Sequence, residues 1–69
     1  MPREVQIKLA TKIAELRKKT GLTQEDLAKT VDVKRSTVSM WESGQSMPRA
    51  ELIPKLAEAL GCSIDEIFE

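Results

Sequence analysis

The 69-residue sequence contains no histidine and only one cysteine. A single cysteine cannot form an internal disulfide, which suits a reducing compartment. Zinc sites need several cysteine, histidine or carboxylate ligands, so we predict neither a metal nor a cofactor. The sequence also lacks a nucleophile paired with a base and a glycine loop that could hold phosphate. We therefore predict that the chain is not an enzyme.

Long apolar runs are lacking as well. No stretch of the sequence approaches the length needed to cross a bilayer, and no signal peptide is recognisable. These absences predict a cytoplasmic protein without a membrane partner. The length favours one domain, residues 1–69, whose small core leaves a thin margin of stability that self-association often supplements.

Charge is balanced overall but unevenly distributed along the chain. The formal net charge is zero, which is unusual for a protein that binds nucleic acid. However, residues 1–35 hold nine basic and five acidic residues, whereas residues 36–69 hold two basic and six acidic residues. This asymmetry suggests that one side of the molecule could meet an anion, although solvated helix faces often carry uneven charge.

The spacing of apolar residues predicts a protein built from short helices. A first helix is expected over about 3–19, because apolar residues recur there every three or four positions. Ile7 lies off this stripe, where it would face solvent or another subunit. The residues of the stripe are Val5, Leu9, Ile13 and Leu16. Four further helices are expected over about 24–30, 34–42, 52 or 53 to 60, and 64–68.

Local signals mark the ends of these helices. Thr23 and Asp26 have the spacing of a capping box, and Ser63 and Glu66 form a second one. Asp32 lies in a turn, where aspartate tolerates a left-handed backbone better than most residues do. Because no strand pattern is present, we predict an all-α fold of five short helices. The residues expected to end helices are Gly21, Gly44 and Gly61.

The second and third helices form a pair with apolar faces. Two helices this short cannot be stable apart, so these faces must pack together at a steep crossing angle. This is the helix-turn-helix pattern, in which the second helix of the pair projects outward and fits the major groove of DNA. The inward residues are Leu27, Ala28 and Val31 on one helix, and Val38 and Trp41 on the other.

The outward faces of the third helix carry side chains suited to reading bases. Arginine can bind guanine through two hydrogen bonds, serine can donate or accept, and methionine can pack on the methyl group of thymine. The helix also lacks a strong N-cap, so its first N–H groups can face a phosphate. The predicted base contacts are Arg35, Ser36, Ser39 and Met40.

The segment TQEDLAKTVDVKRSTVSMWESGQSMP resembles the helix-turn-helix of the phage lambda repressor/Cro-type transcriptional regulators. The preceding GLTQ, the W-E-x-G exit and the closing LAEALGCSIDEIF are also similar to that family, so the resemblance covers about residues 9–69. It implies an all-α fold of five helices, a dimer and a partly palindromic double-stranded DNA operator. Two departures are Asp32, where the family's turn usually carries glycine, and Lys34, where the helix cap is usually serine or threonine.

The resemblance also implies roles for single residues. Arg17 and Glu42 match an ion pair that ties the first helix to the end of the third, and Trp41 is expected in the core. Cys62 is expected to be a small buried side chain. Alternatives remain, since Arg35 could be an ordinary solvent-facing residue and methionine also suits protein interfaces. The residues expected to contact the DNA backbone are Gln24, Lys34, Thr37, Ser43, Gly44 and Arg49.

The acidic second half of the chain is expected to stay clear of DNA and to supply dimer contacts, foremost Ile64, Ile67 and Phe68. We therefore expect a small homodimeric regulator, acting as a repressor, that reads the major groove with its third helix. The alternative is an antitoxin-like protein, which would bind a partner protein and regulate its own promoter. Ile7 and the long first helix leave room for such a partner.

Overall fold

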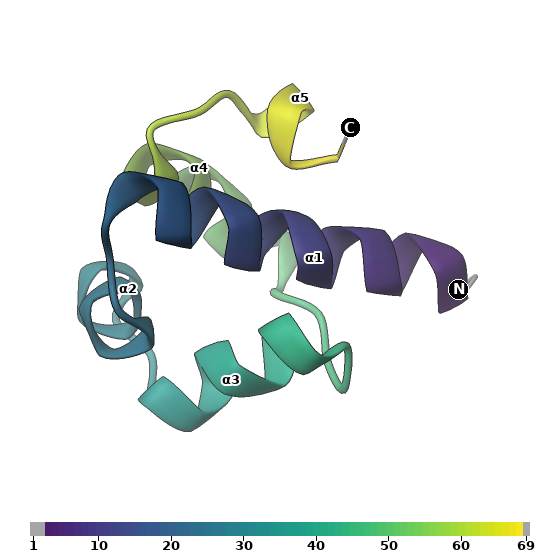
Figure 1. Cartoon of the computed structure of the whole chain (residues 1–69), viewed down its shortest axis with the longest axis horizontal. Helices are drawn as coiled ribbons and strands as arrows, with labels where there is room; N and C mark the ends of the chain where they lie inside the picture. Colours follow the sequence, from purple (N-terminus) through teal and green to yellow (C-terminus); the bar gives the residue numbers. More distant parts are fainter. Residues whose placement is uncertain (1–2, 69) are drawn as a thin grey trace.

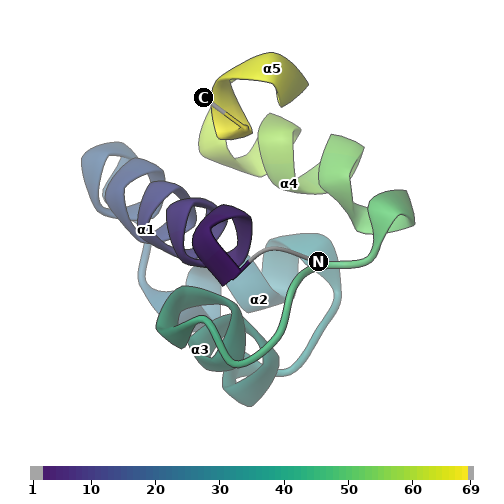
Figure 2. The ribbon, with the colours of Figure 1, turned by 90° about the vertical axis from the view of Figure 1, so that its right-hand side faces the viewer.

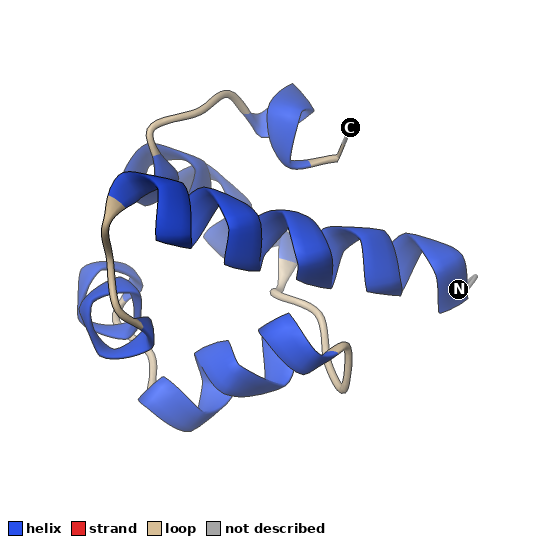
Figure 3. Ribbon diagram, in the orientation of Figure 1, coloured by secondary structure: helices blue, strands red, loops and turns tan. Residues whose placement is uncertain are grey.

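The computed structural model describes residues 3–68, which form five α-helices and one short 3-10 helix, with no strand in this range (Figure 3). The predicted all-α fold is confirmed, and each helix ends within one residue of its expected boundary. The 3-10 helix before α4 was not expected. The elements are α1 (Arg3–Thr20), α2 (Gln24–Val31), α3 (Arg35–Ser43), η1 (Ala50–Leu52), α4 (Ile53–Leu60) and α5 (Ile64–Ile67).

The long α1 runs through the middle of the molecule (Figure 1). α3 lies on one side of α1 and α5 on the opposite side, and the view turned by 90° shows the same separation (Figure 2). α2 lies near the end of α1, and the first turns of α1 extend past the end of α3 (Figure 1). No helix within residues 3–68 is both long and apolar enough to cross a membrane.

One cluster of buried apolar side chains joins all five α-helices. Trp41 is buried in this cluster, as predicted, and anchors α3 against the rest of the chain. Burying apolar surface is the main force that stabilises so small a domain. The cluster consists of Leu9, Ile13, Leu27, Ala28, Val31, Val38, Trp41, Leu56, Ala57, Leu60 and Ile67.

Three expected burial states differ in the structure. Val5, expected on the buried stripe of α1, is 39% exposed in a small hollow that it lines with Ile67 and Phe68, and Ala10 is buried further along the helix. Ile67, expected at a dimer interface, is only 1% exposed. It fills the core of its own chain, because α5 is a single turn with one inward position. Cys62 is half-buried against the core rather than fully enclosed.

Helix ends are stabilised by the predicted local contacts. The Thr23 hydroxyl accepts from the Asp26 N–H and the Asp26 carboxylate accepts from the Thr23 N–H, each at 3.0 Å. Ser63 and Glu66 form the same pair of contacts before α5. Asp32 has φ 60° and ψ 50°, which is the left-handed conformation expected for the turn between α2 and α3.

Candidate nucleic-acid interface

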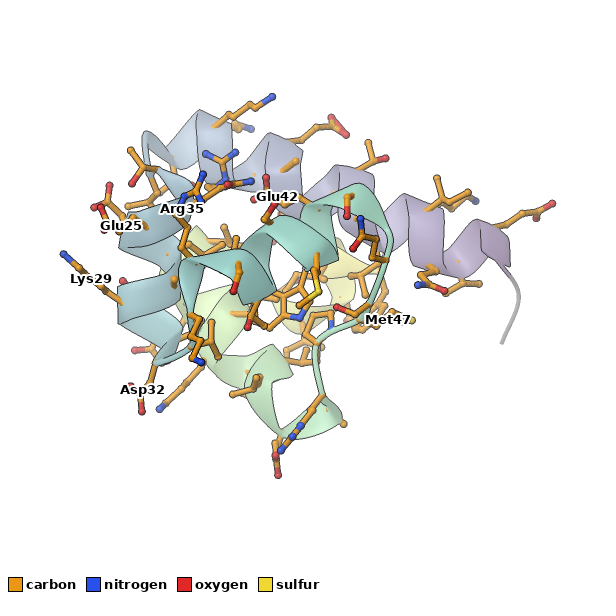
Figure 4. All side chains as sticks on the ribbon, turned by 90° about the horizontal axis from the view of Figure 1, so that it is seen from below. Glu25, Lys29, Asp32, Arg35, Glu42 and Met47 are labelled. Carbon is orange, nitrogen blue, oxygen red and sulfur yellow. The ribbon has the colours of Figure 1, made fainter. Side chains whose placement is uncertain are left out.

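α2 and α3 form a helix-turn-helix whose second helix is presented on one face of the molecule. Their apolar residues pack together as predicted, and Leu27 and Val38 are fully buried between the helices. Figure 4 views the molecule from below, with α3 at the front, α2 on one side and the following loop on the other. α3 is therefore the element of this pair that is presented on this side of the molecule (Figure 4).

α3 is fixed from behind by the predicted ion pair between Arg17 and Glu42. Glu42 points from α3 toward α1 (Figure 4). Arg17 Nε lies 2.6 Å from Glu42 Oε2 and Arg17 Nη2 lies 2.9 Å from Glu42 Oε1, while Arg17 Nη1 donates to the Leu22 carbonyl at 2.8 Å. The two side chains are only 11% and 8% exposed. This two-pronged geometry holds α1, the start of α2 and the last turn of α3 in one arrangement.

The electrostatics of this pair favour its charged form. Burial alone would raise the pKa of the Glu42 carboxyl, but hydrogen bonds from Arg17 and Gln24, with the charges of Arg17 and Lys18, lower the pKa below its usual value. The hydrogen bond to Glu42 raises the pKa of Arg17 despite its burial. Both groups therefore remain ionised at neutral pH.

Gln24, a predicted phosphate contact, is also part of this network. Its Nε2 donates to Glu42 Oε1 at 3.0 Å, which holds the side chain at the start of α2. A glutamine amide carries two hydrogens, so one remains available for a phosphate oxygen. The ion pair thus orients a side chain at the edge of the candidate surface.

The outer face of α3 carries the four predicted base contacts. Arg35, Ser36 and Met40 are exposed and Ser39 is half-buried. Ser36, Ser39 and Met40 lie three and four residues apart, which places them on one side of the helix. Arg35 lies at the start of α3 beside α2 (Figure 4). This face is centred on small polar side chains, so the helix backbone could approach another surface closely.

The loop after α3 differs from its expected form. The Gly44 N–H donates to the carbonyls of Met40 and Trp41, and the Gly44 carbonyl accepts from Gln6 Nε2 at 2.6 Å. Gly44 thus uses both backbone groups inside the protein, and its expected phosphate contact would require the N–H to give up these bonds. Its φ of 81° explains why glycine stands there. The neighbouring Ser43 hydroxyl also donates inward, to the Met40 carbonyl at 3.1 Å.

A groove of about 610 Å³ runs between the first turns of α3 and the segment before α4. Three predicted backbone contacts, Lys34, Thr37 and Arg49, line this one groove although they come from two separate segments. Its floor and walls also include Trp41 and acidic and polar side chains. The remaining lining residues are Asp32, Val33, Ser46, Met47, Glu51 and Leu52.

Two residues of this region were not anticipated. Gln6 reaches Gly44 across 38 positions of sequence, and no local pattern signals such a contact. Glu51 lies in the groove, and its Oε1 is 3.4 Å from Arg49 Nη1. The two-residue spacing of Arg49 and Glu51 could have suggested this exposed pair. Residues 3–68 contain no group of three side chains that could hold a metal ion.

Comparisons with known proteins agree with this geometry. A sequence profile described as helix-turn-helix matches residues 13–67. An uncharacterised HTH-type transcriptional regulator from Methanothermobacter thermautotrophicus is 44% identical over 61 residues, which cover 87% of this chain and 88% of that protein. The resemblance therefore extends over most of both sequences.

Solved structures show the same arrangement of helices. The restriction-modification controller protein C.AhdI from Aeromonas hydrophila matches with a TM-score of 0.85 at 38% identity, covering 91% of this chain and 96% of that chain. The P22 c2 repressor protein, solved in complex with a synthetic operator, matches with a TM-score of 0.82 at 33% identity, covering 88% and 92%. With its helix-turn-helix, its five-helix fold and these relatives, the chain belongs to the lambda repressor/Cro-like family of DNA-binding helix-turn-helix transcriptional regulators.

Proposed function

We propose that the chain is a sequence-specific, homodimeric repressor that places α3 in the major groove of a partly palindromic DNA operator. The observation that carries this proposal is the outer face of α3, which is exposed while the same helix is held from behind by Trp41 and the Arg17–Glu42 pair. The P22 c2 repressor, a structural relative, was solved with a synthetic operator. A rigid helix is needed because base readout depends on a fixed register between side chains and base edges.

In this proposal the predicted contacts divide by chemistry. Arg35 binds a guanine edge, and Ser36, Ser39 and Met40 contact neighbouring bases. Lys34, Thr37 and Arg49 follow one DNA strand along the groove that they line together. Gln24 reaches a phosphate from the start of α2 with its second amide hydrogen. The Ser43 hydroxyl contacts the backbone at the far end of α3, for which it must turn its hydrogen from the Met40 carbonyl to a phosphate oxygen.

The charge distribution supports binding through the α3 side. The acidic residues of η1, α4 and α5 are exposed, and α5 lies across α1 from α3 (Figure 2). The acidic residues of α4 and α5 are thus away from the proposed DNA, whereas Asp32 and Glu51 line the groove. The basic residues Lys34 and Arg35 lie at the start of α3, where the helix dipole also favours phosphate.

The proposed dimer uses the surface around α5. Phe68 is 52% exposed and Ile64 is also exposed, while Phe68, Val5 and Lys8 line a small hollow above the core. Burying such apolar side chains against a second copy would add to the stability of a small domain. A two-fold dimer would place its recognition helices about 34 Å apart, which is one turn of B-DNA.

Selection of bound duplexes from a random library tests this proposal most directly. We expect a palindromic consensus whose half-sites are one helical turn apart, and binding whose log K falls by about 0.9 per log unit of salt for each phosphate neutralised. Enrichment of no sequence, or binding that ignores salt, would contradict the proposal. A consensus without symmetry would contradict the dimer.

A second candidate function is that of an antitoxin-like protein that binds a partner protein and regulates its own promoter. It is favoured by Ile7, a large apolar side chain of α1 that is 52% exposed. Native mass spectrometry of the protein co-purified from its own cells separates the two functions. A stable complex with a different protein supports this candidate, whereas a homodimer alone supports the first.

A further inference from the structure

We infer that Gln6 is a positioning residue for DNA binding, because it holds the loop after α3 in place from the first turns of α1. This inference rests on the proposed function. Gln6 is half-buried, and its Nε2 donates to the Gly44 carbonyl at 2.6 Å. A contact between residues 38 positions apart constrains tertiary arrangement rather than local conformation.

The contact acts on the end of α3 together with the ion pair. α1 holds the last turn of α3 through Arg17 and Glu42, and holds the residue that ends α3 through Gln6 and Gly44. Arg17 and Gln6 are eleven residues apart, which is about 16 Å along a helix. On the other side the two attachments meet Glu42 and Gly44, so they add to the anchoring of α3 by Trp41 at the point where the helix ends and the loop begins.

The loop that begins at Gly44 carries groups that the proposed function needs. The N–H groups of Gln45 and Ser46 both donate to the Met40 carbonyl, so these bonds tie the start of the loop to α3 itself. Gln6 ties it to a different helix. Ser46 and Arg49 follow in this loop and line the groove beside α3. A loop that is ordered before DNA arrives loses less conformational entropy on binding.

Gln6 lies outside the part of the chain that the family profile matches, residues 13–67. Its role therefore follows from the contact seen in this chain and not from family membership. The contact also makes a chemical demand, since a carbonyl oxygen needs a hydrogen-bond donor. Gln6→Glu keeps the size of the side chain but removes the donor, and Gln6→Lys keeps a donor.

The experiment measures affinity for the duplex selected from the random library, at several salt concentrations, and hydrogen exchange of the DNA-free protein. We expect Gln6→Ala to bind about 3- to 10-fold more weakly with an unchanged salt slope, because in this inference Gln6 bonds the loop and not a phosphate. Gln6→Glu also adds a negative charge, so we expect it to bind more weakly than Gln6→Ala at low salt. We expect faster exchange in residues 45–50 but not in α2, and recovery of slow exchange in Gln6→Lys. Thr11→Ala, an exposed change on the same helix, is the matched control and should behave as the native protein.

A double-mutant cycle with Arg49→Ala separates positioning from general destabilisation. If Gln6 acts by ordering the loop, Gln6→Ala costs less affinity once the Arg49 side chain is gone. If the two losses simply multiply, or if Gln6→Ala binds and exchanges like the native protein, the inference is overturned. Failure of the native protein to bind any duplex would overturn the proposed function instead, and hydrogen exchange would still decide whether Gln6 holds the loop.

Discussion

Arg17 and Glu42 meet through two nitrogen–oxygen contacts of 2.6 and 2.9 Å, and this pair ties the first helix to the last turn of α3. Both side chains are mostly buried, so removing either partner would leave an uncompensated buried charge and destabilise the fold. The same carboxylate accepts from Gln24, which brings α2 into the network. The orientation of α3 therefore depends on a contact that itself lies behind the proposed DNA-binding face.

Neutralising Glu42 should destabilise the protein. We expect Glu42→Gln to lower the free energy of unfolding by about 1.5–3 kcal/mol, because the buried guanidinium of Arg17 loses its charged partner. Chemical denaturation followed by circular dichroism measures this change. Glu51→Gln is the control, because the side chains of its pair with Arg49 are 82% and 70% exposed, and it should change stability by no more than about 1 kcal/mol. Equal losses in the two variants would contradict the structural role of Glu42.

Acid should destabilise the native protein partly through the same carboxyl. The pKa of Glu42 is lower in the folded chain than its usual value of 4.5, so its contribution is fully present above that pH and is lost as pH falls through the folded pKa. We expect the temperature of thermal unfolding to decrease as the pH is lowered below about 4.5. This decrease should be less steep in Glu42→Gln than in the native protein. Part of the slope should remain, since capping hydrogen bonds also lower the pKa of Asp26 and Glu66. Identical pH profiles for the two proteins would argue against the assignment to Glu42.

Arg35 should set sequence preference, and its neighbour Lys34 should not. We expect Arg35→Ala to weaken binding by about 1–3 kcal/mol and to relax preference at one base pair, because it removes a base contact. Lys34→Ala should weaken binding on all sequences alike and reduce the salt slope by about one. Titration of each variant against duplexes mutated at single positions measures both effects. A uniform loss for Arg35→Ala would make Arg35 a phosphate contact instead.

Glu51 should oppose DNA binding. Glu51 lines the groove with Lys34 and Arg49, and its Oε1 forms an ion pair with Arg49 Nη1 at 3.4 Å. Removing this charge would release Arg49 and remove a repulsion of phosphate, so we expect Glu51→Gln to bind about 2- to 5-fold more tightly at low salt. Glu58→Gln on α4, also exposed, is the matched control. The gain in DNA affinity should become smaller as the salt concentration increases. Weaker DNA binding by Glu51→Gln would show instead that Glu51 contributes favourably to binding.

Patterns within a few residues predicted helix ends well, because the contacts that end helices are themselves local. Thr23 reaches Asp26 only three residues away, and Asp32 has the left-handed turn expected from its type. Burial was less predictable. The spacing of Val5 suggests a core position, yet whether a helix face is covered depends on how far its neighbours extend. Ile67 likewise is buried because α5 turns it inward.

The candidate site was predicted as a set of side chains but not as an arrangement. Helical periodicity indicated that Val38 and Trp41 point inward, which left the outer face of α3 for recognition. It could not show that Lys34 and Arg49 share a groove with Glu51, since these residues belong to segments that meet only in the folded chain. Nor could it show that Gly44 uses its backbone groups internally.

The amino-acid sequence by itself determined the helices, their caps and the choice of apolar faces, because each depends on side chains less than two turns apart. The resemblance of its central segment to known regulators also indicated the family. Only the tertiary structure decided which polar groups remain available at the surface and which are used inside. The physical reason is that Gln6 and Gly44, or Lys34 and Arg49, become neighbours only when the core closes, and no local spacing encodes that distance.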